Sequence, residues 1–353
     1  MIRVALDARR LQDRPYTGVG RLMAHFLPFL SKHVEILLLT DARRPSPEVG
    51  DFEEVRLDVP GKLPEPVWLQ LSAARWLRGF TGLFHGTYNA IPLAWRGPAV
   101  VSMYDLSWEH HPEDFSLARR MSLVTQARWS ARHVGAIVTC SEHARSSIIA
   151  TYKIPADRVF NAPPAVDPIF NPARAAVVAP VLARLGVEGP YVTAMGGARR
   201  RGLEVAVAAW QRLPAAGRPS LVVVGSEAPP PVPGIVHAGR ISDEEWSAVL
   251  AGAEAFCYPT RFEGYGMPAL EAAASGIPVV CARVASLPEV LGSAAEWSAS
   301  GSVADIGAAL ERVVGDPVRR AALREAGLAR AAAAPTWEQS AAVQLQAYEM
   351  AAS

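Results

Sequence analysis

Two glutamates in a largely apolar segment are the residues of this chain best placed to do chemistry. The segment reads "RFEGYGMPALEAAASGIPVV" over residues 261–280, with Glu263 ahead of a glycine turn and Glu271 inside the helix expected to follow. Pro268 fits the first turn of that helix. Glycines let a ligand approach the backbone closely, and a helix amino terminus directs partial positive charge at it. The turn therefore predicts a phosphate-binding site.

The positions of the two carboxylates predict different tasks. Glu271 lies about one turn into the helix, where a carboxylate can accept both hydrogen bonds of a ribose diol. Glu263 follows a strand, so we expect it in the crevice outside the carboxyl edge of a sheet, holding hydroxyls or easing a developing cation. The competing explanation is that both are solvated helix-end residues, one of them stabilised by the helix dipole.

Short apolar runs separated by helix-length stretches must position these groups. Strands are expected at 3–8, 34–40, 99–104, 136–141, 191–197, 220–226, 255–260 and 277–282, and helices at 116–134, 202–213 and 242–252. This alternation predicts an α/β protein with parallel, doubly wound sheets. Because 353 residues exceed what one hydrophobic core usually holds, we expect two domains, divided near residue 170 in a proline-rich stretch.

The overall composition excludes several functions. Thirty-five basic and 34 acidic residues give a net charge of +1, so any anion site must be local and no nucleic-acid partner is expected. Three scattered cysteines, in no metal-ligand spacing, fit a reducing cytoplasm. No apolar run approaches the roughly 18 residues that span a bilayer. A cytoplasmic protein is expected, with the inner face of the membrane as a further place for it to act.

The glutamate segment and its continuation resemble a known family. "RFEGYGMPALEAAASGIPVVCARVASLPEVLG" is similar to the Glu-x(7)-Glu segment of retaining glycosyltransferases of the GT-B fold, specifically glycosyltransferase family four. The resemblance implies that Glu263 lies against the donor sugar and that Glu271 binds the ribose. It also implies a donor-binding turn formed by Gly264, Tyr265, Gly266, Met267 and Pro268.

The resemblance implies a domain plan for the whole chain. It places a Rossmann-like acceptor-binding domain at 1–170, a Rossmann-like donor-binding domain at 171–335 and, at 336–353, a helix that packs back on the first domain. In such a GT-B fold, the two domains face a cleft.

A second motif resembles the family's grip on the donor diphosphate. In "GGARRRGLEVAVAAW", the best register puts the family's Arg-Lys pair on Arg200 and Arg201, with arginine in place of lysine. Arginine binds phosphate bidentately, so this exchange should preserve the function. The preceding Gly196 and Gly197 belong to the same donor site. The resemblance further implies that the stretch near Arg240 and Ile241 flanks the nucleotide base.

The amino-terminal half contributes weaker signals. Gly18 and Gly20 of "TGVGR" make an incomplete dinucleotide fingerprint, because Met23 stands where a third glycine should be. As the family's amino-terminal loop, the same residues would face the donor phosphate and sugar.

Two further amino-terminal segments, "FHGTYNAIPL" and "VSMYDLSWEHHPEDF", resemble acceptor-side or sugar-side segments of the family. They nominate His85, Tyr104 and Asp105. Relatives commonly carry His-Asp at the last two positions. Tyr104 thus departs from the pattern, because a tyrosine cannot act as a base near neutral pH.

Together these features predict a retaining hexosyltransferase. It would move a sugar from a nucleotide-diphosphate sugar, with a lean toward GDP-mannose, to a hydroxyl of a glycan, a lipid-linked saccharide or a small natural product. No Asp-x-Asp pair occurs, so we expect neither a metal nor a cofactor, and the nucleotide sugar is a co-substrate.

Three alternatives stay open. One is a nucleotide-sugar binding protein with reduced or lost turnover, which Tyr104 favours. Another is a dinucleotide oxidoreductase that rests on "TGVGR". For the basic, tryptophan-bearing helix at 116–134, peripheral contact with an anionic membrane is the alternative to an ordinary solvated surface.

Overall fold

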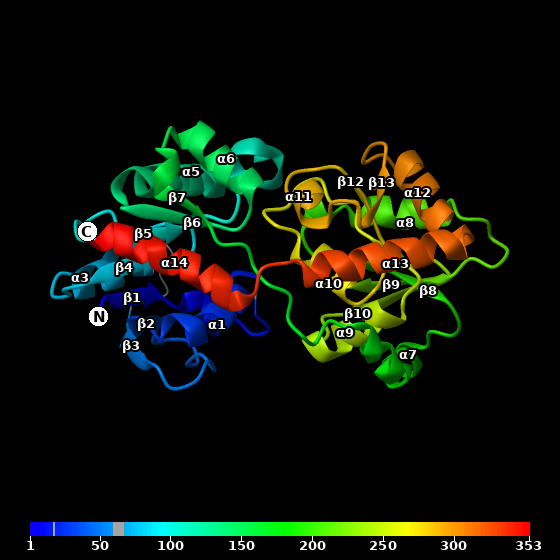
Figure 1. The fold of residues 1–353 in the computed structure, drawn as a ribbon, viewed down its shortest axis with the longest axis horizontal. Helices are drawn as coiled ribbons and strands as arrows, with labels where there is room; N and C mark the ends of the chain where they lie inside the picture. Colours follow the sequence, from blue (N-terminus) through cyan, green and yellow to red (C-terminus); the bar gives the residue numbers. More distant parts are fainter. Residues whose placement is uncertain (17, 59–66) are drawn as a thin grey trace. The chain divides into compact units, whose positions relative to one another are not determined.

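The computed structural model describes all residues of the chain except 17 and 59–66 (Figure 1). Its contacts divide the chain into two compact units. The first unit comprises Met1–Pro164 together with Pro335–Ser353, and the second comprises Ala165–Ala334. The first boundary falls a few residues before the division expected near residue 170. The carboxyl-terminal segment joins the first unit through its contacts, as described below.

The first unit is built on a seven-stranded sheet. Its strands have the order β3-β2-β1-β4-β5-β6-β7, and every neighbouring pair is parallel. The bounds are β1 Arg3–Asp7, β2 Glu35–Asp41, β3 Glu53–Leu57, β4 Leu83–Gly86, β5 Ala99–Ser102, β6 Ala136–Thr139 and β7 Val159–Asn161. The central strands are buried along their length, as parallel strands covered on both faces must be.

The second unit is built on a six-stranded sheet, which is also parallel. Its bounds, in the spatial order β10-β9-β8-β11-β12-β13, are Ile235–Gly239, Ser220–Val224, Tyr191–Met195, Phe256–Cys257, Val279–Ala282 and Ala295–Ser298. The strand order reverses between β8 and β11. Open α/β sheets bind ligands at the carboxyl edge of such a switch point. The doubly wound α/β prediction is confirmed.

Helices connect the strands in both units. In the first unit they are η1 Arg9–Gln12, α1 Gly18–Leu30, η2 Trp68–Ala73, α3 Ala74–Leu77, α4 Ser107–His110, η3 Pro112–Asp114, α5 Leu117–His133, α6 Glu142–Tyr152, η4 Ala156–Arg158 and α14 Trp337–Ala352. In the second unit they are η5 Pro172–Val177, α7 Ala179–Leu185, η6 Arg199–Arg201, α8 Leu203–Gln211, α9 Asp243–Gly252, α10 Met267–Ala274, α11 Leu287–Leu291, α12 Val303–Gly315 and α13 Pro317–Ala332. The helices predicted at 116–134, 202–213 and 242–252 correspond to α5, α8 and α9. The helix expected after the glycine turn is α10, and the one expected at 336–353 is α14.

The last helix is an integral part of the first unit. A capping box starts α14: the Gln339 amide donates to Thr336 Oγ1 at 3.1 Å, and the Gln339 side chain accepts from the Thr336 amide at 2.9 Å. The helix then packs on α1 and along β4, β5, β6 and β7 (Figure 1). Its indole at Trp337 stacks on His25, with ring centroids 4.5 Å apart.

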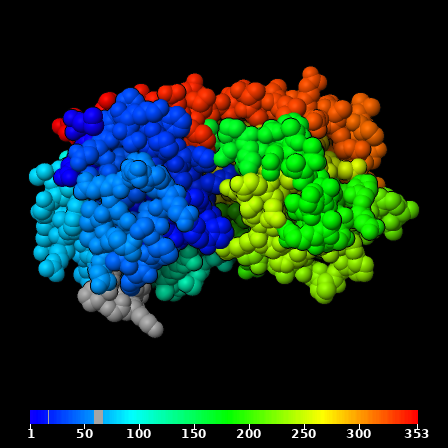
Figure 2. Space-filling view, turned by 90° about the horizontal axis from the view of Figure 1, so that it is seen from below, coloured from blue at the N-terminus to red at the C-terminus, as the bar shows by residue number. Residues whose placement is uncertain are grey.

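In the second unit, η5 and α7 hold α9 in place. Both elements pack against α9, and Figure 2 shows their green side chains beside the yellow-green side chains of the α9 region. Arg174 donates to Ser247 Oγ and to the carbonyl of Glu244, both at 3.0 Å. These contacts fix α9 along its middle, one residue away from Trp246.

Candidate functional site

Two loops of the second unit are bonded to each other at the switch point. The first follows β8 and the second follows β11, its neighbour in the sheet. The carbonyl of Arg200 accepts from the Arg261 amide at 2.8 Å and from Thr260 Oγ1 at 3.2 Å. Gly202 has φ +69°, and a Cβ there would lie 2.5 Å from the carbonyl oxygen of Pro259. Only glycine fits this close approach.

The loop contacts bring the predicted arginines to the first glutamate. Arg200 Nη2 lies 3.9 Å from Glu263 Oε2, and Arg201 Nη1 donates to the Gly196 carbonyl at 3.2 Å. The Nε of Arg201 is buried and has no hydrogen-bond partner among the described residues. A buried donor of this kind gains free energy from an acceptor, and an anionic ligand can supply one.

Glu263 itself is held from two sides. The residue is 8% exposed, and its Oε1 accepts from the Tyr258 hydroxyl at 2.5 Å. Its backbone carbonyl and that of Tyr265 lie 3.0 and 2.8 Å from the Ser286 hydroxyl. Burial, and then the nearby Glu263 charge, raise the pKa of Tyr258 well above its ordinary value. The phenol therefore stays protonated and donates to the carboxylate.

Glu271 lies in the helix that begins directly after the turn. Gly266 caps α10 with φ +98°, and a Cβ there would lie 2.6 Å from Leu287 Cδ2. Met267 and Pro268 form the first turn of the helix, as the sequence indicated. Glu271 is 3% exposed, and its Oε2 accepts from the indole Nε1 of Trp246 at 3.1 Å. A buried carboxylate needs such partners.

A third acidic side chain lies against the glycine loop after β8. The amide of Gly197, which has φ +122°, donates to Glu227 Oε2 at 3.1 Å. A Cβ on Gly196 would lie 2.8 Å from the Glu227 carbonyl. The Glu227 carboxylate thus accepts from the Gly197 amide, a residue that the sequence assigned to the donor site. A phosphate that used this amide would have to displace the carboxylate.

The predicted base-flanking residues lie between β10 and α9. Arg240 is exposed and Ile241 is partly buried. They directly precede Ser242, which caps α9 in a capping box with Glu245. Their contact with a base stays a prediction, but α9 connects this stretch to Trp246 and hence to Glu271.

In the first unit, the described part of "TGVGR" forms the start of α1, which begins at Gly18. A Cβ on Gly20 would lie 2.3 Å from the carbonyl oxygen of Arg10, so close packing against η1 explains this glycine. A Cβ on Gly18 would meet nothing within 4 Å. Packing therefore does not explain Gly18, and the predicted ligand contact stays open for it.

Tyr104 and Asp105 follow β5. Asp105 Oδ1 accepts from the amide of Ser107 at 2.9 Å. Ser107 is the first residue of α4. The hydroxyl of Tyr104 is buried near the Ser102 side chain, and it meets good hydrogen-bond geometry with no group of the described chain. Burial raises the pKa of Tyr104, so its hydroxyl stays neutral. The side chain offers a neutral donor but no base.

His85, which the sequence nominated for the acceptor or sugar side, lies inside the first unit. His85 has no exposed surface, and its Nδ1 and Nε2 lie 2.8 Å from Tyr348 Oη and from Ser102 Oγ. Gln344 Nε2 donates to the same Tyr348 hydroxyl at 2.7 Å. Burial lowers the pKa of His85 to about 3. The imidazole therefore belongs to a polar cluster between the sheet and α14, and its contact with an acceptor or sugar stays a prediction.

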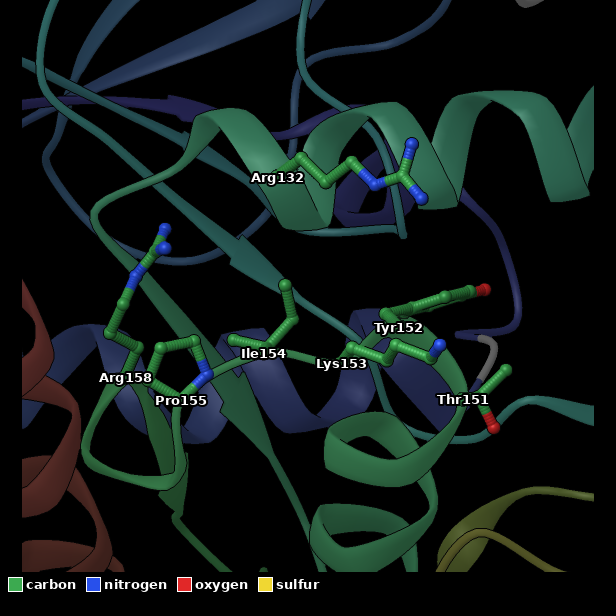
Figure 3. Close-up of a pocket in the computed structure, with 7 residues that line it drawn as sticks. All are labelled: Arg132, Thr151, Tyr152, Lys153, Ile154, Pro155 and Arg158. Carbon is green, nitrogen blue, oxygen red and sulfur yellow. The ribbon is translucent and has the colours of Figure 1, made fainter.

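One pocket of the first unit contains none of the predicted site residues. It has a volume of about 420 Å³, and Figure 3 shows its lining residues, Arg132, Thr151, Tyr152, Lys153, Ile154, Pro155 and Arg158. Its cations lie where α5 and α6 end. Arg158 donates to the carbonyls of Val134 and Gly135. These charges compensate the negative ends of two helices.

No three His, Cys, Asp or Glu side chains in the described part of the chain form a group that could hold a metal ion. None of the helices described is both long and apolar enough to cross a lipid bilayer.

The two doubly wound parallel sheets, with paired arginines and glutamates at the switch point of the second, define the GT-B class of glycosyltransferases. Comparison with protein families agrees. Residues 16–170 match the model described as Glycosyltransferase Family 4, and residues 189–316 match Glycosyl transferases group 1. The chain belongs to glycosyltransferase family 4, and it is an enzyme of that class.

Curated relatives have related names. The chain is 28% identical to an MMP alpha-(1->4)-mannosyltransferase of Mycolicibacterium hassiacum, over 85% of this chain and 79% of the relative. It is 30% identical to the O-antigen chain mannosyltransferase B of Escherichia coli, over 71% of this chain and 70% of the relative.

Solved structures share the fold. A sucrose-phosphate synthase from Thermosynechococcus elongatus superposes with a TM-score of 0.76 at 17% identity, covering 99% of this chain and 98% of the other. A protein of Anabaena in complex with UDP and glucose gives a TM-score of 0.74 at 14% identity, covering 98% and 99%. At these identities, the likeness supports the GT-B fold alone.

Four residues at the site were not predicted from the sequence: Tyr258, Trp246, Ser286 and Glu227. Tyr258 had a detectable signal, because it lies in the apolar run 255–260, a few residues before Glu263. The other three belong to separate segments of the chain. Trp246 and Ser286 reach the glutamates, and Glu227 reaches Gly197, through the packing of α9, α11 and the loop after β9.

Proposed function

We propose that this glycosyltransferase is a retaining enzyme that needs no metal and uses a nucleotide-diphosphate sugar, with GDP-mannose the favoured donor. The observation that carries the proposal is the pairing of Arg200 with Glu263 at 3.9 Å, on loops bonded at the switch point of the second sheet. Positive and negative groups adjoin there, as a diphosphate next to a sugar requires.

Each residue at this point has a distinct task in the proposal. Arg200 and Arg201 hold the donor diphosphate, and the amino terminus of α10 adds partial positive charge. Glu271 binds the ribose diol. Glu263 contacts the hydroxyls of the transferred sugar and stabilises the positive charge that develops on it.

Retention follows from a front-side reaction. The bond between the anomeric carbon and the diphosphate oxygen breaks, and the acceptor oxygen bonds to the same face of that carbon. The departing diphosphate oxygen takes the acceptor proton, so the reaction needs no protein base. This accommodates Tyr104, whose neutral hydroxyl can hold a sugar oxygen but cannot remove a proton.

The donor preference rests on relatives. Both curated relatives described above are named mannosyltransferases, and a third, from Corynebacterium glutamicum, is named as GDP-mannose-dependent. That relative matches only 28% of this chain. The acceptor is a hydroxyl of a glycan, a lipid-linked saccharide or a small natural product. Peripheral contact with a membrane, and location in the cytoplasm or at its inner face, stay predictions.

A donor panel tests the proposal. The purified chain is mixed with GDP-mannose, GDP-glucose, UDP-glucose, UDP-galactose and ADP-glucose, each with and without EDTA. A bound donor raises the unfolding temperature by mass action. We expect the largest rise and the fastest donor hydrolysis with GDP-mannose, unchanged by EDTA. If NMR shows that hydrolysis first releases the β-configured hexose, retention is contradicted. If EDTA abolishes hydrolysis, metal independence is contradicted.

The same panel decides the alternative function. Tyr104, which stands where relatives commonly carry histidine, favours a binding protein with reduced or lost turnover. That protein would show a tight donor shift with neither hydrolysis nor transfer. If Tyr104→His then restored turnover, the tyrosine would be the cause of the loss.

A further inference from the structure

We propose that Trp246 and Tyr258 are positioning residues that set the two glutamates of the donor site separately. Trp246 orients Glu271 for donor binding, and Tyr258 orients Glu263 for sugar transfer. The kinetic part of this inference rests on the proposed function. The pairing itself can be tested without any ligand.

The Tyr258 contact is short and fully enclosed. Tyr258 has no exposed surface, and Glu263 is 8% exposed. The hydroxyl donates to Oε1 at 2.5 Å, while Oε2 lies on the side of Arg200, 3.9 Å from its Nη2. A hydrogen bond to a charged acceptor is among the strongest in proteins. The phenol thus fixes the rotation of the carboxylate and determines which oxygen faces the arginine.

The Trp246 contact fixes the second carboxylate from another element. Trp246 is 4% exposed and Glu271 is 3% exposed. The indole Nε1 has one hydrogen and can only donate, and it does so to Oε2 at 3.1 Å. α9 holds Trp246 in place, because Arg174 ties the next residue, Ser247, to η5. The orientation of Glu271 therefore depends on α9 as well as on its own helix.

The ring of Phe256 contacts both Trp246 and Tyr258. Phe256 of β11 meets Trp246 edge to face at 5.8 Å and 72°, and it stacks on Tyr258 at 5.0 Å and 22°. Phe256 has no exposed surface and pairs with Thr193 and Val279 in the sheet. We call these three side chains, Trp246, Phe256 and Tyr258, the aromatic layer. Through Phe256, the layer fixes the indole of Trp246 and the phenol of Tyr258 to the centre of the sheet.

Conservative variants separate positioning from packing. Tyr258→Phe and Trp246→Phe each remove one hydrogen bond and keep an aromatic ring in the layer. Matched controls exist in the same unit. Tyr191→Phe removes a buried hydroxyl that donates to the Val249 carbonyl at 2.8 Å, and Trp210→Phe removes an indole that donates to the Pro219 carbonyl at 2.7 Å. Neither control residue contacts Glu263 or Glu271 in the hydrogen bonds of the described chain.

Two kinetic quantities carry the prediction. Tyr258→Phe should lower kcat about tenfold with little change in the Kd of the nucleoside diphosphate, and Trp246→Phe should raise that Kd about tenfold with little change in kcat. GDP binding is measured by calorimetry and kcat from donor hydrolysis at saturation. The controls should change neither quantity at matched thermal stability. Equal effects of all four variants would overturn the inference.

A ligand-free measurement keeps this inference distinct from the proposed function. The Trp246 indole resonance is assigned by its loss in Trp246→Phe protein labelled with ¹⁵N at tryptophan. It should shift in Glu271→Gln, while the Trp210 resonance should not. In the same way, the ultraviolet Raman bands of Tyr258, assigned with Tyr258→Phe, should shift in Glu263→Gln.

The outcomes separate cleanly. Unshifted signals in a chain that transfers sugar would overturn the inference and leave the proposed function standing. Shifted signals in a chain that binds no nucleotide sugar would overturn the proposed function. The kinetic tasks proposed for Trp246 and Tyr258 would then be overturned as well. Shifted signals together with the split between kcat and Kd would support both.

Discussion

Arg200 and Glu263 lie 3.9 Å apart, Nη2 to Oε2, although they follow different strands of the second sheet. Their proximity depends on the bonds that the Arg200 carbonyl accepts from Thr260 and Arg261. The charge arrangement of the site is thus built into the backbone of two loops.

The two glutamates should give different kinetic effects. Glu263→Gln keeps the shape but removes the charge that stabilises the reacting sugar, so we expect kcat to fall about 100-fold. Glu271→Ala removes the ribose contact, so the Kd of GDP should rise about tenfold to 100-fold. Calorimetry and donor hydrolysis measure the two effects. Small, equal effects of both changes would contradict this division of tasks.

The positive charge of Arg201 should matter for donor binding. Methionine keeps much of the side-chain length but removes the guanidinium that would bind the diphosphate. We expect Arg201→Met to raise the KM of the donor about tenfold, equivalent to about 1.4 kcal/mol, whereas Arg201→Lys should keep most of the binding because it keeps the charge. The exposed Arg184, on α7, provides the control, because Arg184→Met should leave KM unchanged. An unaltered KM in Arg201→Met would mean that this side chain does not bind the diphosphate.

Removing Glu227 should tighten donor binding. Its carboxylate accepts from the Gly197 amide at 3.1 Å, so it competes with a phosphate for that donor and repels its charge. Glu227→Gln should lower the Kd of GDP, by about threefold to tenfold, and flatten its dependence on salt. Glu188→Gln makes the same charge change at the opposite end of β8. Weaker binding in Glu227→Gln would show that Glu227 supports the loop.

Stability should fall in mild acid because of His85. Its folded pKa, lowered by burial to about 3, lies below the ordinary 6.5. The unfolded chain therefore takes up the proton first as the pH falls. Stability present above pH 6.5 should be lost on the way down to pH 3, by up to about 1.4 kcal/mol per pH unit. Urea unfolding between pH 7 and pH 5 measures this slope.

His85→Gln should flatten that slope, whatever it does to stability itself. The exposed His33 supplies the control, since His33→Gln should keep the slope. Burial raises the pKa of Asp7, but the adjacent Arg9 guanidinium outweighs burial and lowers that pKa below its ordinary value. Asp7 therefore loses its stabilising charge only at a lower pH than the one at which His85 acts. A wild-type slope in His85→Gln would show that other groups cause the acid sensitivity.

The stability of the chain should depend on the hydrogen bond between Tyr348 of α14 and His85. Tyr348→Phe leaves His85 Nδ1 without its partner at 2.8 Å, and a buried polar group left unpaired costs about 1–3 kcal/mol. We expect the free energy of unfolding to fall by that amount in urea, while GDP binding in the second unit stays unchanged. A loss below about 0.5 kcal/mol would mean that water or a rearranged side chain replaces the phenol.

Strands with long apolar runs could be predicted, and others could not. β2 and β9 are bounded apolar runs that parallel sheets bury. β3 and β10 lie at sheet edges and are only partly buried, so their sequences lack that signal. β4 is central and buried but contains His85, and a polar residue in a short strand indicates a site rather than a core. A partner 263 positions away, Tyr348, satisfies it.

The sequence alone nominated the groups that are proposed to do the chemistry. Glycine turns next to Glu263, Glu271 and the arginine pair indicate phosphate and sugar contacts, because few other tasks need these residue types at these spacings. Tertiary structure decided what holds each group, since Trp246 and Tyr258 reach the carboxylates and α14 closes over His85. Hydrogen-bond partners come from segments joined only by packing, and spacing along the chain does not record which segments meet.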